Sequence, residues 1–316
     1  MLVNKKLIRK NVISLSSSVH SREHVSVIVP VFNDNVGLNA TLEALDRQTF
    51  PCENFEVIVV DNNSEVRVEV SQVFRFRLRI LHERKPGSYA ARNKGIACCS
   101  GSILVFTDAD CEPAPDWLEN GVSCLQKAGE QSLVGGRVEL FLPSSCSSSF
   151  ASVYSMYAGF NQQSNIENKG YIATANLFCF RSTAEKVGMF ETRLLSGGDS
   201  EWSWRAAKLG CALVYAEGVL VRHPCRTTLN SLVIQARRVA GGRAQLALIG
   251  TNVDRSVVAT NHVIGPSLFS ILQSLYETKE LSVAHKFQVL VVGALVKLAT
   301  VREKLLLKLG GRAERR

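Results

Sequence analysis

The sequence lacks the spacings that mark a zinc site or a disulfide framework. Its nine cysteines are an odd number and form no CxxC pair, and Cys98 and Cys99 are adjacent. The basic N-terminal segment lacks the apolar core of a secretory signal, because it turns polar at Ser14–Ser18. We therefore expect free, mostly buried thiols in a reducing cytosol, with a zinc site as the minor alternative.

Strong positive charge is absent from the middle of the chain. Of a formal net charge of +9, residues 1–24 supply five Lys or Arg against one Glu, and residues 281–316 supply eight against two Glu. A nucleic-acid-binding protein usually has a basic face on its folded core, so we expect no nucleic-acid partner. Basic ends favour an anionic membrane surface, and solubilising tails are the alternative reading.

The C-terminal region also lacks an apolar run that could span a bilayer. The uninterrupted run around Val289–Val296 is about ten residues, whereas a spanning helix needs roughly 20. Over residues 284–309, Lys286, Lys297, Lys304 and Lys308 gather on one helical face. An apolar face beside a lysine-rich face is typical of a helix lying in the membrane interface. Packing of the apolar face on the catalytic domain is the alternative.

What the sequence does contain is a regular alternation of strand and helix patterns. Three β-branched, apolar runs at 25–31, 56–61 and 103–107 are typical of strands buried on both faces of a parallel sheet. Helical patterns at 36–48 and 88–99 lie between them. The alternation predicts an α/β fold with a mostly parallel central sheet and right-handed crossovers.

The second half of the chain carries weaker signals. Residues 172–180 and 211–217 read as strands, and 199–209 as a helix, and from about 229 the pattern is helical. No internal repeat or long low-complexity linker interrupts the chain. We expect a basic N-terminal tail over 1–24, one catalytic domain over 25–250, and a helical, basic extension over 251–316.

Polar and acidic side chains follow each of the three predicted parallel strands. The first ends at Pro30-Val31-Phe32-Asn33, the second at Asp61-Asn62-Asn63-Ser64 and the third at Thr107-Asp108-Ala109-Asp110. Ligands of such sheets bind at the C-terminal strand ends, so we expect these side chains to meet at one edge. This convergence is the main functional signal before any resemblance is considered.

The Asp108-Ala109-Asp110 triplet indicates a divalent cation. Carboxylates alone would repel a diphosphate, and Mg²⁺ or Mn²⁺ between them reverses that repulsion, since hard cations prefer oxygen ligands. Asp61 could accept hydrogen bonds from a base or ribose. For the triplet, the alternative reading is a turn with an Asx cap, and for Asp61 it is a simple turn after the strand.

Three further features could take part in chemistry. A helix begins after Pro86-Gly87 and carries Arg92, and helix N-termini favour anions. Asp199 lies where a glycine pair meets a helix, which suits a general base, although an N-cap is the simpler reading. His223 could be a metal ligand or a structural histidine.

In this order, the segments resemble the family 2 glycosyltransferases of the GT-A fold. No single motif carries the resemblance, which covers residues 25–245 and rests on order and spacing. The matching segments are VSVIVPVFND (25–34), VIVVDNNS (57–64), GSYAARNKGI (87–96), VFTDADCEPAPDWL (105–118), GGDSEWSWR (197–205) and VRHPCR (221–226). The GSYAARNKG and FTDADC forms look most like bacterial enzymes of surface or extracellular polysaccharide synthesis.

The resemblance implies a binding site for a nucleotide-sugar donor. Pro30, Phe32 and Asp61 match positions that hold the nucleotide base. Arg92 matches a basic residue near that base, and Asp108 matches the carboxylate that faces the ribose.

The resemblance also implies a metal and a base. Asp110 matches the main ligand of a Mg²⁺ or Mn²⁺ ion, and His223 a histidine that can complete the metal site. Asp199 matches the base of inverting members, which deprotonates a hydroxyl of a glycan or lipid-linked glycan acceptor. Many members have Glu-Asp where this chain has Gly198-Asp199, which puts the acceptor contacts in doubt.

Two rival functions stay open. A nucleotidyltransferase that makes nucleotide-sugars would carry a glycine-rich, Arg-containing loop after the first strand, which residues 30–38 lack. A catalytically inactive carbohydrate-binding or scaffold protein would be expected to lose its acidic site residues. We therefore predict a metal-dependent, inverting glycosyltransferase in the cytoplasm, peripheral on the inner face of the plasma membrane.

Overall fold

The computed structural model describes residues 24–70, 72–249 and 282–311. The predicted tail over 1–24 therefore lies almost wholly outside the described residues, as do 250–281 and 312–316 of the C-terminal region. The chain divides into two compact units. The first unit contains the sheet, and the second contains residues 140–160, 193–197 and the chain from Pro224 onward.

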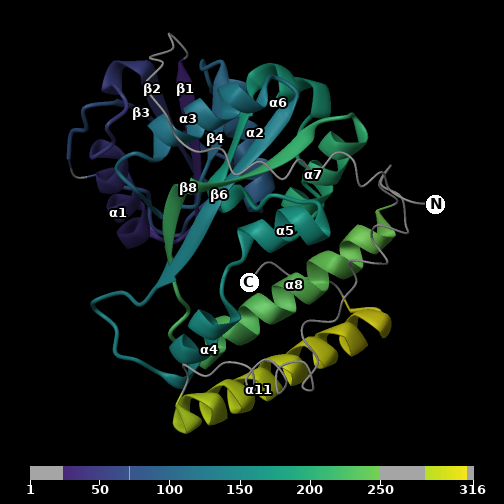
Figure 1. The fold of residues 1–316 in the computed structure, drawn as a ribbon. Coiled ribbons are helices and arrows are strands. Elements are labelled where there is room, and N and C mark those ends of the chain that lie inside the picture. Colours follow the sequence, from purple (N-terminus) through teal and green to yellow (C-terminus); the bar gives the residue numbers. More distant parts are fainter. Residues whose placement is uncertain (1–23, 71, 250–281, 312–316) are drawn as a thin grey trace. The chain divides into compact units, whose positions relative to one another are not determined.

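The first unit is built on a single mixed sheet (Figure 1) in the strand order β3-β2-β1-β4-β7-β6-β8-β5. Strands β1 (Val25–Val31), β2 (Phe55–Asp61) and β4 (Ile103–Phe106) are parallel, and every residue in them is buried. Burial on both faces explains their unbroken apolar character. The predicted parallel α/β core is confirmed.

One parallel strand was not predicted. Strand β3 (Arg77–His82) pairs with β2 at the edge of the sheet, and each of its residues is exposed or half-buried. Its Arg77 and Arg79 are charged side chains of the kind that protect sheet edges from association. The mixed sequence RLRILH gave no apolar run to detect.

The other half of the sheet is antiparallel. Strand β7 (Leu177–Phe180) pairs with β4 and with β6 (Ser132–Phe141), and β5 (Glu112–Pro113) pairs with β8 (Ala212–Pro224). The strand predicted at 172–180 is wrong in its first half, which contains a 3₁₀ turn, η3 (Thr174–Asn176). The buried Asn176 amide accounts for that turn, because it accepts from Trp117 Nε1 and donates to two backbone carbonyls.

Helices connect the strands of this unit. The first two are α1 (Asn35–Asp46) and α2 (Ser88–Cys98), which lie where the helical patterns predicted them. A short 3₁₀ turn, η2 (Cys52–Asn54), leads into β2. The remaining helices of the unit are α3 (Trp117–Ala128), α5 (Gln162–Lys169), α6 (Arg181–Val187) and α7 (Gly198–Lys208).

The second unit is helical. Helices α4 (Phe150–Ala158), α8 (Leu229–Leu248) and α11 (Val283–Lys308) pack on one another around Ala151, Leu232 and Val292. Helix α8 thus groups with α11, although it precedes the boundary predicted at 250, because their apolar faces meet. Within the described helices, none is both long and apolar enough to cross a bilayer.

Candidate active site

The C-terminal ends of the parallel strands bring the predicted donor residues to one edge. The sheet register places Asp61 beside Val31 of β1 and beside His82 of β3. Pro30 is buried within β1, and Phe32, just beyond the strand, is exposed. The convergence predicted for the first two strand ends is therefore observed.

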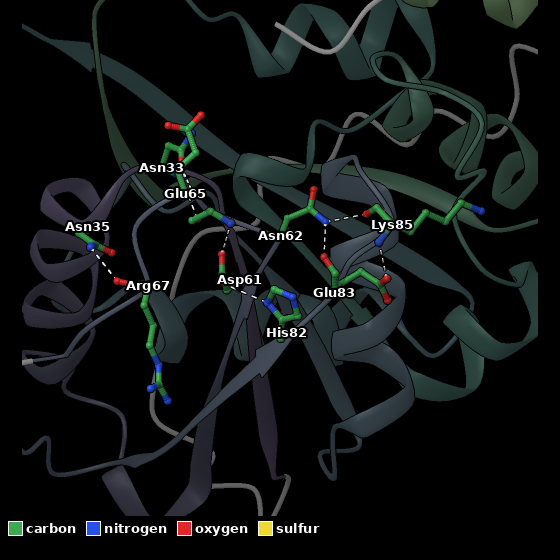
Figure 2. A network of polar contacts seen from close by, with 10 residues as sticks. Asn33, Asn35, Asp61, Asn62, Glu65, Arg67, His82, Glu83 and Lys85 are labelled. Atoms are coloured by element: carbon green, nitrogen blue, oxygen red, sulfur yellow. Dashed lines mark hydrogen bonds and ion pairs between the residues drawn. The ribbon is translucent and has the colours of Figure 1, made fainter.

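Asp61 is held by its neighbours at this edge, as Figure 2 shows. Its Oδ1 accepts a hydrogen bond from the Ser64 backbone N–H at 3.0 Å, and its Oδ2 lies 3.4 Å from His82 Nδ1. The first contact closes an Asx turn after the strand, where the alternative reading for Asp61 was a simple turn. The second leaves a carboxylate oxygen beside a half-exposed imidazole, which sequence reasoning missed.

Asn62 fixes the loop that leads to α2. Its side chain donates to the carbonyls of Glu83 and Lys85 (Figure 2). Its side-chain oxygen also accepts from the Gly87 N–H at 2.7 Å. Asn33 has a positive φ of 53° and ties the first strand end to the second, through Ser64 Oγ and the Glu65 N–H. Hydrogen bonds thus hold the loops at this edge to one another, which suits a preorganised ligand site.

Asp108 follows β4 and forms an ion pair with Arg92 of α2, with Arg92 Nη2 2.5 Å from Asp108 Oδ1. The Arg92 side chain is only 4% exposed, and its guanidinium lies 5.7 Å from the centre of the Tyr89 ring. Its Nε–H is buried without an acceptor in the described part of the chain. Arg92 therefore orients the Asp108 carboxylate, and the predicted place of Arg92 near the nucleotide base stays a prediction.

Asp110 and His223 come together through the pairing of β5 with β8. That register sets Glu112 against Arg222 and Pro113 against Val221, so the next residue of β8 reaches back to the triplet. His223 Nε2 lies 3.6 Å from Asp110 Oδ1. The two predicted metal residues are thus brought together from positions far apart in the sequence.

These side chains fit a hard divalent cation. Ligand atoms of Asp110, His223 and Cys111 lie within 4.8 Å of one another. Burial, reinforced by Asp108 and Asp34, raises the pKa of Asp110 against the opposing effect of His223. Such an environment gains from a bound cation, and carboxylate with imidazole is a donor set that Mn²⁺ accepts.

Cys111 was not among the site residues predicted from the sequence. It directly follows the Asp108–Asp110 triplet and is fully buried. Burial, together with the two neighbouring carboxylates, holds the pKa of its thiol well above the ordinary value. A buried, protonated and soft sulfur is a poor ligand for Mg²⁺ or Mn²⁺, so we leave it out of the donor set.

Asp199 lies in the first turn of α7, on the Arg92 side of the site. It accepts hydrogen bonds from the Ser200 N–H at 2.9 Å and from the Tyr89 hydroxyl at 3.3 Å. Burial raises the pKa of Asp199, and these hydrogen bonds and Arg92 oppose the rise. A carboxylate with a raised pKa can take a proton near neutral pH more effectively than an ordinary aspartate.

Tyr89 also explains why position 198 is a glycine in this chain. A Cβ added to Gly198 would lie 2.6 Å from Cε2 of the Tyr89 ring, which stacks on Phe190. No larger residue fits at 198 while that ring stays in place. The Tyr89 ring therefore occupies the space that a side chain at 198 would enter, and its hydroxyl donates a hydrogen bond to the adjacent Asp199.

Comparisons with known proteins identify a family of enzymes to which this chain is similar. The family model described as "Glycosyl transferase family 2" matches residues 26–181. The chain is 36% identical to the glycosyltransferase AglE of Haloferax volcanii, over 71% of this chain and 74% of that protein. It is 26% identical to the amylovoran biosynthesis glycosyltransferase AmsB of Erwinia amylovora, over 65% of this chain and 71% of that protein.

A solved structure shares the fold. The mannosyltransferase PcManGT of Pyrobaculum calidifontis, determined in complex with GDP-Man and Mn²⁺, superposes with a TM-score of 0.58 at 18% identity, covering 92% of this chain and 89% of that one. With the fold, the strand-end carboxylates and the identity to AglE taken together, this chain belongs to the family 2 glycosyltransferases and has the GT-A fold.

Proposed function

We propose that this glycosyltransferase moves a sugar from a nucleotide-diphosphate sugar to an acceptor hydroxyl by a metal-dependent, inverting displacement. The observation that carries the proposal is the meeting of Asp110 with His223 beside the Arg92–Asp108 pair, which Tyr89 links to Asp199. A carbohydrate-binding scaffold would need none of these half-buried carboxylates with their charged and hydroxyl partners.

The donor would bind at the edge formed by β1, β2 and β4. Asp61 offers an oxygen to a base or ribose, and the exposed Phe32 offers an apolar surface next to it. Asp108 is half-buried and fixed by Arg92, so it can accept from ribose hydroxyls without changing its rotamer. Preorganisation of this kind lowers the entropy cost of binding.

Asp110 and His223 would hold the divalent cation. Their donor set and the raised pKa of Asp110 support this role, as does the Mn²⁺ bound in the PcManGT complex. When bound, such an ion offsets the negative charge that develops on the departing nucleoside diphosphate.

Asp199 would act as the general base. Its carboxylate takes the proton of the acceptor hydroxyl while the hydroxyl oxygen forms a bond to the anomeric carbon. The bond from that carbon to the diphosphate oxygen breaks in the same step, so the configuration inverts. The Tyr89 hydroxyl and the Ser200 N–H keep Asp199 oriented before and after it accepts the proton.

The acceptor would be a glycan or a lipid-linked glycan of a surface or extracellular polysaccharide. The name of AmsB as an amylovoran biosynthesis enzyme supports this setting. The nine cysteines are all free, which supports a reducing, cytoplasmic location.

The test is release of nucleoside diphosphate from a panel of nucleotide-sugars, with and without candidate glycan acceptors. We expect one donor to be turned over with Mn²⁺ or Mg²⁺, a block by EDTA, and recovery on adding the ion back. If every donor is inert with every acceptor while one still binds, the chain is a binding protein. Turnover that EDTA leaves unchanged would remove the metal from the proposal.

A further inference from the structure

Among the residues that the structure describes, helix α11 packs through one of its faces within the second unit. Val289 packs against Val153, Tyr154 and Tyr157 of α4, and Val292 packs against Ala151 and Leu232. On the same face, the buried Glu303 forms an ion pair with Arg237 of α8 at 2.6 Å. Figure 1 shows α8 and α11 side by side along this contact.

The opposite face of α11 is also apolar, and it is exposed. Phe287 is 62% exposed, Leu298 66% and Leu309 84%. At 100° per residue these positions fall on one side of the helix, away from Val289 and Val292. The full set, here named the outer stripe, is Phe287, Ala294, Leu298, Val301, Leu305 and Leu309. A continuous exposed apolar stripe marks an interaction surface.

A row of lysines runs along one edge of the outer stripe. Lys286, Lys297, Lys304 and Lys308 each directly precede a residue of the stripe, so they lie about one hundred degrees around the helix from it. This lysine row therefore separates the outer stripe from the packed face. Lysine stems of this kind can lie along an apolar surface while the ammonium groups reach out to phosphate.

We propose that the outer stripe and the lysine row form a docking surface for an anionic lipid bilayer, with α11 lying in the plane of the headgroups. Apolar side chains would enter the acyl boundary, and the adjacent lysines would contact lipid phosphates. The charge complementarity selects this occupant, because a second copy of the same face would set lysine row near lysine row. The inference does not depend on the sugar transferred.

The experiment measures sedimentation of the full chain with vesicles of phosphatidylcholine, with or without phosphatidylglycerol, in the absence of donor and acceptor. We expect binding to the anionic vesicles that weakens as salt rises. Leu298→Glu with Leu305→Glu should lower that binding by roughly a hundredfold or more, from the usual worth of leucine burial. Lys304→Gln with Lys308→Gln should lower it by roughly twentyfold, and leave binding to neutral vesicles unchanged.

The matched control is Leu248→Glu, because Leu248 is 85% exposed on α8 and lies outside the outer stripe. It should bind vesicles like the wild type, and all variants should keep the wild-type circular dichroism and melting temperature. A wild type that stays in the supernatant at low salt overturns the proposal, as do stripe variants that still bind. A dimer that the stripe variants dissociate, without any vesicle binding, would assign the surface to a second copy instead.

Discussion

At the scale of single residues, the position of the Tyr89 ring requires a glycine at position 198. Gly198→Ala places a Cβ against a ring that is already held by Phe190 and Arg92. We expect a loss of about 1–3 kcal/mol in the free energy of unfolding, typical of overpacking. In a Tyr89→Ala background the same change should cost almost nothing. Equal costs in both backgrounds, measured by urea denaturation, would show that the two residues do not interact.

Asp199 makes a second residue-scale prediction. Asp199→Asn should lower kcat by about 10²–10⁴-fold, the usual worth of a general base, while donor affinity changes little. The amide keeps the shape of the carboxylate and the Ser200 contact, so the fold should survive. A variant that loses donor binding but keeps kcat would place Asp199 in the donor site.

The pH dependence follows from the contacts of Asp199. A base must be deprotonated, and burial raises the pKa of Asp199, so activity should fall on the acid side at a higher pH than for an ordinary aspartate. The Tyr89 hydroxyl opposes that rise. Tyr89→Phe should therefore move the acid limb of kcat to still higher pH. An acid limb that does not move would leave Tyr89 a packing residue only.

At the scale of elements, an ion pair between Arg237 and Glu303 adds to the apolar contact of α8 with α11. Glu303 is buried, so Glu303→Ala leaves the Arg237 charge without this partner and should destabilise the protein by about 3 kcal/mol. The control is Arg222→Ala, which removes a much more exposed pair with Glu112 and should cost about 0–1 kcal/mol. Chemical denaturation measures both, and similar losses for the two variants would contradict this ranking.

Element by element, the sequence was most informative where burial was complete. The strands β1, β2 and β4 are apolar along their whole length, and their patterns identified them. Strand β3 was not predicted, because an edge strand is partly exposed to solvent and its sequence lacks a continuous apolar run. The meeting of Asp110 with His223 depends on the pairing of β5 with β8, and no local pattern reveals a pairing across more than one hundred residues.

At the scale of the whole molecule, the resemblance to a family assigned roles to site residues that the spacing of residues alone could not assign. Strand-end carboxylates predicted a site at one sheet edge, but the placement of Asp199 beside that site depends on its contact with Tyr89. Nothing in the glycine pair at the start of α7 indicated that contact. Likewise, the lysine pattern of α11 was visible in the sequence, whereas its two apolar faces needed the packing against α4 and α8.

The central claim is that Asp110 and His223 hold a cation on which donor binding depends. Calorimetric titration of the nucleotide-sugar donor into wild type and Asp110→Ala, each with Mn²⁺ and with EDTA, tests it most directly. The matched control is Asp116→Ala, since Asp116 is exposed and lies outside the site. We predict tight binding by wild type and Asp116→Ala only with Mn²⁺, and weak binding by Asp110→Ala in either condition. Mn²⁺-dependent binding that survives in Asp110→Ala, with its fold intact, would contradict the account.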